Sequence, residues 1–140
     1  MYIINRIEMI KMKKNGFTLI EILAVLIILG VVGLIVMPVV TNSLRESKDD
    51  LYNVQISNIK EAAKTWSADN MNKLPTTTGG NKNVNLKMLQ DEGYIEENIT
   101  NPKTDETFDP LKVCVNIKFN GKKYVYTVTD GTANCTNLFS

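Results

Sequence analysis

The residue whose type and position point most clearly to chemistry is Glu21, an acidic side chain inside what otherwise resembles a membrane span. Residues 22–40, ILAVLIILGVVGLIVMPVV, hold no charged side chain, and a basic segment that ends at Gly16 precedes them. A carboxylate deep in the apolar region of a membrane helix costs about 2.5–3.5 kcal/mol on insertion scales. Glu21 is therefore a candidate functional residue, and it needs a cationic partner.

Three kinds of N-terminal segment compete for residues 1–40. A secretory signal peptide has a shorter apolar core and an A-x-A-like cleavage site, which the following residues VVTNSLRES lack. A single-span anchor fits better, because nineteen uncharged residues are roughly enough to cross a bilayer as a helix. Residues 1–16 carry four basic residues against Glu8, a net charge of +3 that keeps the N-terminus cytoplasmic. An ordinary anchor, however, gives Glu21 no role.

The third kind of segment supplies the missing partner. Residues 13–21, KKNG-FTLIE, resemble the class III signal of type IV pilins and pseudopilins. In that family a prepilin peptidase cuts after the Gly and the new N-terminal residue is N-methylated. The resemblance implies a cut after Gly16, methylation of Phe17, and assembly through Glu21, which lies one helical turn beyond the new amine. In a filament, Glu21 would pair with the Phe17 amine of a neighbouring subunit, and because breaking a buried ion pair costs about 3–5 kcal/mol, the pairing enforces register.

Other features of the first forty residues agree with the resemblance. Pro38 lies where the family often has a proline that kinks or locally melts the apolar helix, because proline removes a backbone hydrogen bond. Gly30 and Gly33 offer small surfaces for close helix approach, although any membrane helix may carry such residues. Translation from Met1 gives a leader of sixteen residues, whereas Met12 gives the compact leader MKKNG; the sequence leaves both starts open.

Composition argues against catalysis. The chain of 140 residues has no His, which removes the commonest general base and the commonest metal ligand. No nucleophile motif or metal-ligand spacing is present, so we expect neither an enzyme nor a cofactor. The net charge of +1 gives no footprint for nucleic acid. Asp105, Glu106 and Asp109 are candidate Ca²⁺ ligands by resemblance to the major pseudopilins, but their spacing matches no calcium pattern and a solvated turn is the preferred interpretation.

The elements that must carry these residues give an α+β fold, with a long N-terminal helix packed on a small C-terminal antiparallel sheet, as in pilins. We expect a removable leader at 1–16, a membrane or filament-core helix at 17–40 and an extracytoplasmic globular domain at 41–140. One helix is predicted from about residue 18 to about 71. Its second half is amphipathic, because apolar residues recur at intervals of three and four: Tyr52, Ile56, Ile59, Ala63 and Trp66.

Shorter elements follow this helix. Residues 74–83 are predicted to form a turn-rich connection, and a short helix is expected at 85–94 with Leu86, Leu89 and Tyr94 facing inward and Gly93 near its end. The pattern Leu-x-x-Leu-x-x-x-Gly-Tyr-Ile in this region resembles pilin-like proteins of Gram-positive bacteria. Residues 98–110 are predicted to form a loop.

A β-hairpin is predicted over residues 112–129, because two strand-like segments flank Asn120-Gly121, the strongest short hairpin signal. A two-residue turn places Phe119 opposite Lys122 and Lys118 opposite Lys123. The same register pairs three apolar residues of each strand on one face, which would cover the stripe that bears Trp66: Val113 with Val128, Val115 with Tyr126, and Ile117 with Tyr124.

The two cysteines, Cys114 and Cys135, restrict the C-terminal tail. An even pair in a small extracytoplasmic domain is typical of a disulfide, and closing this loop adds about 3 kcal/mol. A tail that simply extended the hairpin would leave Cys135 two strands, or about 9–10 Å, from Cys114, whereas bridged Cα atoms lie within roughly 7 Å. If the disulfide forms, the strand at 112–119 is therefore central or next to the tail. The alternative is two free thiols.

The resemblance predicts a structural subunit of a type IV pilus, a competence pseudopilus or a type II secretion pseudopilus. Its expected partners are the prepilin peptidase and N-methyltransferase, other pilin subunits, and membrane lipid before assembly. We expect a single-pass membrane protein with a cytoplasmic N-terminus, which joins a cell-surface filament. The alternative is a membrane-anchored binding module that never polymerises, keeps residues 1–16 and tolerates Glu21→Ala.

Overall fold

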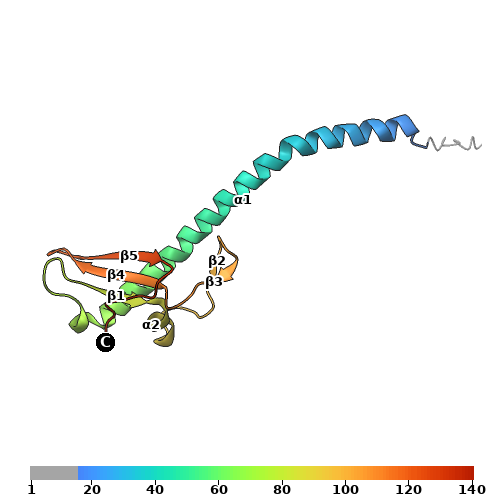
Figure 1. Ribbon diagram of the computed structural model, residues 1–140. Coiled ribbons are helices and arrows are strands. Elements are labelled where there is room, and N and C mark those ends of the chain that lie inside the picture. The colour runs from blue at the N-terminus through green and yellow to red at the C-terminus, as the bar shows by residue number, and fades with distance from the viewer. Residues whose placement is uncertain (1–15) are drawn as a thin grey trace, which may run out of the picture. The chain divides into compact units, whose positions relative to one another are not determined.

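A computed structural model describes residues 16–140 (Figure 1). The predicted leader up to residue 15, with both candidate starts, lies outside the described residues. The chain divides into two compact units, Met1–Asn42 and Ser43–Ser140. Helix α1 (Leu19–Asp69) contributes to both units.

In the first unit, α1 is exposed on all sides. It is the one helix among the described residues that is long and apolar enough to cross a membrane, with a mean hydropathy of 3.1 over its most apolar window. The helix continues through Pro38, and the Thr41 hydroxyl donates to the Met37 and Pro38 carbonyls at 3.2 and 3.0 Å. The kink expected at Pro38 stays a prediction.

In the second unit, α1 supplies one wall of the hydrophobic core. Ile59, Ala63 and Trp66 are fully buried, and Tyr52 and Ile56 pack against the core with part of their surface exposed. The predicted apolar stripe is therefore confirmed. The helix ends at Asp69, two residues before the predicted end, and the 3-10 helix η1 (Met71–Lys73) follows it.

The opposite wall is a three-stranded antiparallel sheet of β1 (Asn81–Asn85), β4 (Val113–Phe119) and β5 (Tyr124–Asp130), in the order β1-β4-β5. The prediction that the strand at 112–119 is central or next to the tail is confirmed, because β4 is the middle strand. Strand β1 was not predicted, because its sequence NKNVN has one apolar residue and resembles a turn. Its pairing with β4, in which Val84 lies opposite Val115, is a tertiary contact.

The hairpin forms, but the predicted two-residue turn is wrong. Phe119 pairs with Tyr124, so the turn contains four residues, Asn120 to Lys123. Asn120 makes this longer turn possible, because its side chain accepts the Lys122 and Lys123 N–H groups. The register shifts by two residues, and Lys118 therefore lies opposite Val125 instead of Lys123.

The apolar face survives this shift, because side chains alternate with a period of two along a strand. Val115 now pairs with Val128, and Ile117 with Tyr126, while Val113 lies opposite Asp130. The three apolar residues of β4 are fully buried, and their face covers Trp66 as expected.

Helix α2 (Leu86–Asp91) is shorter than the predicted helix at 85–94, because β1 extends to Asn85 and the helix ends three residues early, with its C-cap at Glu92. The Asn85 side chain caps α2 by accepting the Met88 N–H at 2.8 Å. At the other end, the Tyr94 N–H donates to the Leu89 carbonyl and the Gly93 N–H to that of Gln90, which is a Schellman motif. Leu86 and Leu89 are buried and Tyr94 is half-buried, as predicted.

The segment predicted as a loop at 98–110 contains a small second sheet. Strands β2 (Thr100–Asn101) and β3 (Glu106–Thr107) pair antiparallel. The loop prediction is wrong for these four residues. Strands of two residues are too short to give a recognisable alternation in the sequence.

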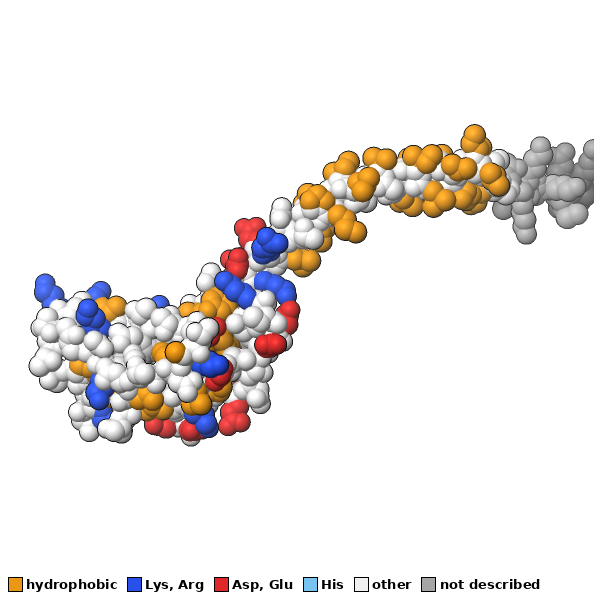
Figure 2. All heavy atoms as spheres, in the orientation of Figure 1, with side chains coloured by type: hydrophobic (Ala, Val, Ile, Leu, Met, Phe, Trp, Pro, Cys, Tyr) orange, Lys and Arg blue, Asp and Glu red, His pale blue; other side chains and the backbone are white. Residues whose placement is uncertain are grey.

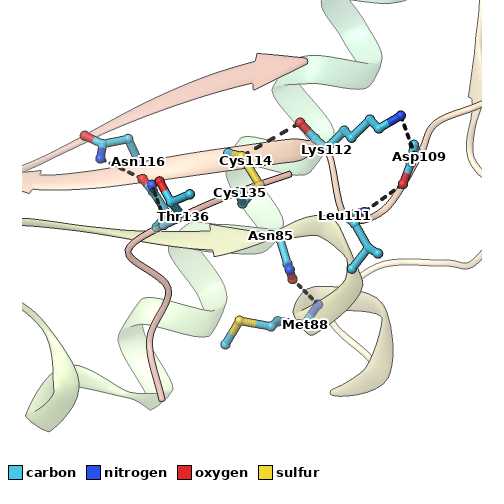
Figure 3. The surroundings of a disulfide bond; sticks show 10 residues. Asn85, Met88, Asp109, Leu111, Lys112, Cys114, Asn116, Cys135 and Thr136 are labelled. Atoms are coloured by element: carbon cyan, nitrogen blue, oxygen red, sulfur yellow. Dashed lines mark hydrogen bonds and ion pairs between the residues drawn. A yellow bond between two sulfur atoms is a disulfide. The ribbon is translucent and has the colours of Figure 1, made fainter. Parts of the chain in front are cut away.

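The C-terminal tail returns across the sheet through a disulfide between Cys114 and Cys135, whose Cα atoms are 5.7 Å apart (Figure 3). The predicted pairing is confirmed. Beyond Cys135 the tail lies parallel to β1 through a bridge between Asn83 and Leu138. Phe139 is buried, with its ring centroid 5.0 Å from that of Trp66. The α+β class with a long helix on a small antiparallel sheet is thus confirmed, and the arrangement fits the pilin fold.

Candidate processing and assembly site

The peptide bond between Gly16 and Phe17 lies before the start of α1. Both residues are without regular secondary structure, and the Phe17 side chain is 81% exposed. The first helical residue is Leu19. A cut at this bond would leave the helix intact and place the new amine at its N-terminal end.

Thr18 and Glu21 cap the start of α1 reciprocally. The Thr18 hydroxyl accepts the Glu21 N–H at 3.3 Å, and the Glu21 carboxylate accepts the Thr18 N–H at 3.3 Å. This is the capping box S/T-x-x-E. The Glu21 N–H is shared with the Thr18 carbonyl, which accepts it at 3.1 Å. Thr18 was not among the predicted site residues, although the capping signal Thr-Leu-Ile-Glu stands in the sequence.

Glu21 is electrostatically isolated. It is the only charged side chain between Phe17 and Leu44, and it forms no ion pair among the described residues. Its place in the first helical turn is favourable, because the N-terminal end of a helix carries partial positive charge. The carboxylate accepts the amide N–H of Thr18, the residue just before the helix.

Apolar side chains cover the helix beyond this carboxylate (Figure 2). Every residue from Leu19 to Val40 is exposed within the described chain, and large apolar side chains point to all sides. An apolar surface of this extent is stable in lipid or against other apolar helices, because water disfavours it.

The other predicted site residues belong to the second unit. The disulfide at Cys114 and Cys135 holds the tail (Figure 3). The Cys135 N–H also donates to the Leu111 carbonyl at 3.0 Å. Its role is structural, since both sulfurs are bonded.

Two of the three candidate calcium ligands, Asp105 and Asp109, are engaged in other interactions, and the third, Glu106, is exposed in β3. Asp105 pairs with Lys48 at 2.6 Å, and Asp109 pairs with Lys112 at 3.3 Å while it accepts the Leu111 N–H. No group of three or more His, Cys, Asp or Glu residues is placed to hold a metal within residues 16–140.

Four groups of the second unit have raised pKa values, and two of these, Asp130 and Tyr52, are partly buried. Partial desolvation, with a smaller effect of Asp109, raises the pKa of Asp130 above its ordinary value. Partial burial, helped by Asp130 and opposed by Lys103, raises the pKa of Tyr52.

Comparison with known proteins finds one match. Residues 11–37 match the family model for the prokaryotic N-terminal methylation motif. No curated protein and no solved structure matches the chain significantly. The matched segment contains Gly16, Phe17, Thr18 and Glu21, the residues that lie together at the start of α1. The motif, followed by a long helix and a small antiparallel sheet, supports a place for this chain among type IV pilin-like proteins.

Proposed function

We propose that this chain is a structural subunit of a type IV pilus or of a secretion or competence pseudopilus. Prepilin peptidase cuts after Gly16, the Phe17 amine is methylated, and the subunit leaves the membrane to join a filament through residues 17–40. The matched methylation motif supports processing. Pilin-like proteins are generally structural, and the chain is not expected to catalyse a reaction.

The observation that carries this proposal is the lone carboxylate of Glu21 in a fully exposed apolar helix. In lipid its charge is costly. Pairing with the Phe17 amine of a neighbour offsets that cost for both charges, provided that the two helices are in register. Before assembly, the Thr18 capping box gives the carboxylate a local hydrogen-bond partner.

Two substitutions separate the charge of Glu21 from its capping role. Glu21→Gln keeps an oxygen that accepts the Thr18 N–H, because Gln also serves in a capping box, but it removes the charge. Thr18→Ala removes the hydroxyl cap, at a cost of about 1 kcal/mol to the helix start, and keeps the charge. We expect Glu21→Gln to abolish filaments and Thr18→Ala to reduce them only modestly.

Mass spectrometry of the N-terminus from native membranes tests processing directly. N-methylphenylalanine at Phe17 is the expected result. An intact segment 1–16, together with normal behaviour of Glu21→Ala, would instead support the anchored binding module. Filaments of ordinary yield from a methylated Glu21→Gln chain would refute the electrostatic pairing.

A further inference from the structure

The turn between β4 and β5 presents two lysines on a preorganised support. The Asn120 side-chain oxygen accepts the Lys122 N–H at 3.1 Å and the Lys123 N–H at 2.9 Å. The Asn120 N–H donates to the Lys123 carbonyl at 3.1 Å, and Gly121 takes a φ of 88°. A partner that binds these lysines therefore orders little additional backbone, which reduces the entropic cost of association.

The end of the second unit that bears this turn is uniformly basic. Residues 70–83 and 116–126 are neighbours, since the Gly79 N–H donates to the Phe119 carbonyl at 2.8 Å. These two segments contain no Asp or Glu and five lysines: Lys73, Lys82, Lys118, Lys122 and Lys123. None of the five forms an ion pair with any residue that the structure describes. Figure 2 shows Lys and Arg side chains gathered at this end.

A groove of opposite character lies between α1 and the segment that follows α2. Its volume is about 690 Å³, and its walls include Asn58 and Glu61 on one side and residues 94–100 on the other. The Tyr94 hydroxyl donates to Asp69 at 2.8 Å, which ties the second wall to α1. Glu96 and Glu97 on that wall are exposed and form no ion pair within residues 16–140.

One copy cannot insert its own turn into its own groove. The groove wall at Ile99 bonds to Phe108, which precedes the start of β4, whereas the turn follows the other end of β4. Seven residues of strand separate these ends by roughly 20 Å. Figure 1 shows the β4–β5 turn projecting away from α2, β2 and β3.

We propose that the β4–β5 turn of one copy docks into the groove of a second copy, with Lys122 and Lys123 facing Glu96 and Glu97. The two surfaces differ, so the contact is heterologous, and repeated heterologous contacts build open filaments where the rotation between copies does not close into a ring. This inference rests on the proposed function and names which parts of neighbouring globular units meet. Electrostatic complementarity would add specificity to assembly driven by the apolar helices.

Cysteine cross-linking in the full chain in its native membranes tests the contact. Lys122→Cys combined with Glu97→Cys leaves Lys123 and Glu96 in place, and oxidation should produce a ladder of linked subunits. The control combines Lys122→Cys with Glu106→Cys, because Glu106 is also exposed but lies in β3, outside the groove. The control should give no ladder.

Charge reversal gives an independent readout. Lys122→Glu with Lys123→Glu should lower filament yield by about tenfold or more, because like charges then face each other. Glu96→Lys with Glu97→Lys should lower the filament yield by a similar factor. A chain that carries all four substitutions should regain the yield of the unmodified chain, because opposite charges face each other again.

The outcomes separate this inference from the function on which it rests. Absence of methylation at Phe17 would refute the proposed function. A methylated chain whose filaments need Glu21, but which gives no ladder or gives one equally with Glu106→Cys, would overturn the docking alone. Binding of the lysine turn to inorganic polyphosphate, with no ladder, would also overturn it by assigning the turn to a polyanion.

Discussion

Removing the disulfide tests how the tail is held in the globular unit. Cys114→Ala with Cys135→Ala opens a loop of sequence separation 21. In the chain-entropy model a loop of this length contributes about 3 kcal/mol at 25 °C. A unit of this size has a total stability of about 5–15 kcal/mol, so the loss is a large fraction of it.

The single tryptophan makes the measurement specific. Trp66 is fully buried in the second unit, and its fluorescence therefore reports the unfolding of that unit in the full chain in detergent. We expect the urea midpoint to fall by about 1–3 M and the melting temperature by roughly 12–24 °C. Reduction should destabilise the unmodified chain by a similar amount and leave the double variant unchanged. A loss below about 0.5 kcal/mol would refute the loop-closure reasoning.

A third variant separates loop closure from contacts of the tail. Phe139 packs on Trp66. The backbone of Asn83 also holds the tail, because its N–H donates to the Asn137 carbonyl and its carbonyl accepts the Phe139 N–H. Phe139→Ala should cost about 3–5 kcal/mol, as for other buried aromatic residues. If the disulfide acts by loop closure, its removal and Phe139→Ala should have additive effects. Strong non-additivity would instead show that the disulfide acts by holding Phe139 in place.

Further predictions concern backbone strain and pH. Gly93→Ala should lower the free energy of unfolding by about 1–2 kcal/mol, because φ at Gly93 is 79° and this left-handed conformation disfavours a side chain. Gly131→Ala is the neutral control in the same urea titration, because Gly131 has equal space for a Cβ and no positive φ. Gly121→Ala should also destabilise, since φ is 88° and a Cβ would lie 3.0 Å from the Thr78 hydroxyl. The raised pKa of Asp130 means that the folded state disfavours its ionised form, so Asp130→Asn should raise the urea midpoint at pH 7. This gain in stability should vanish as the pH falls through the folded-state pKa and below 3.8, because the carboxyl is then protonated in both the folded and the unfolded state. An unchanged gain at low pH would contradict the raised pKa of Asp130 as its cause.

The N-terminal features could be predicted from the sequence because they depend on local order along the chain. The apolar run, the isolated Glu21 and the signal around Gly16 and Phe17 need no tertiary contact to be recognised. The stripe that ends at Trp66 was predicted for the same reason, since helical periodicity is written in the sequence. The capping role of Thr18 was equally available in Thr-Leu-Ile-Glu, but was overlooked.

Tertiary structure alone decided how the short elements pair. Asn81–Asn85 has no strand signal of its own and becomes a strand because β4 offers it a free edge. Asn120 lengthens the hairpin turn through its side chain, which overrides the preference of Asn-Gly for two residues. The groove with Glu96 and Glu97 exists only where α1 meets a segment some forty residues later. Local propensities for helix and strand differ by a fraction of a kcal/mol to about 1 kcal/mol per residue. In short segments, long-range pairing and burial therefore determine which secondary structure forms.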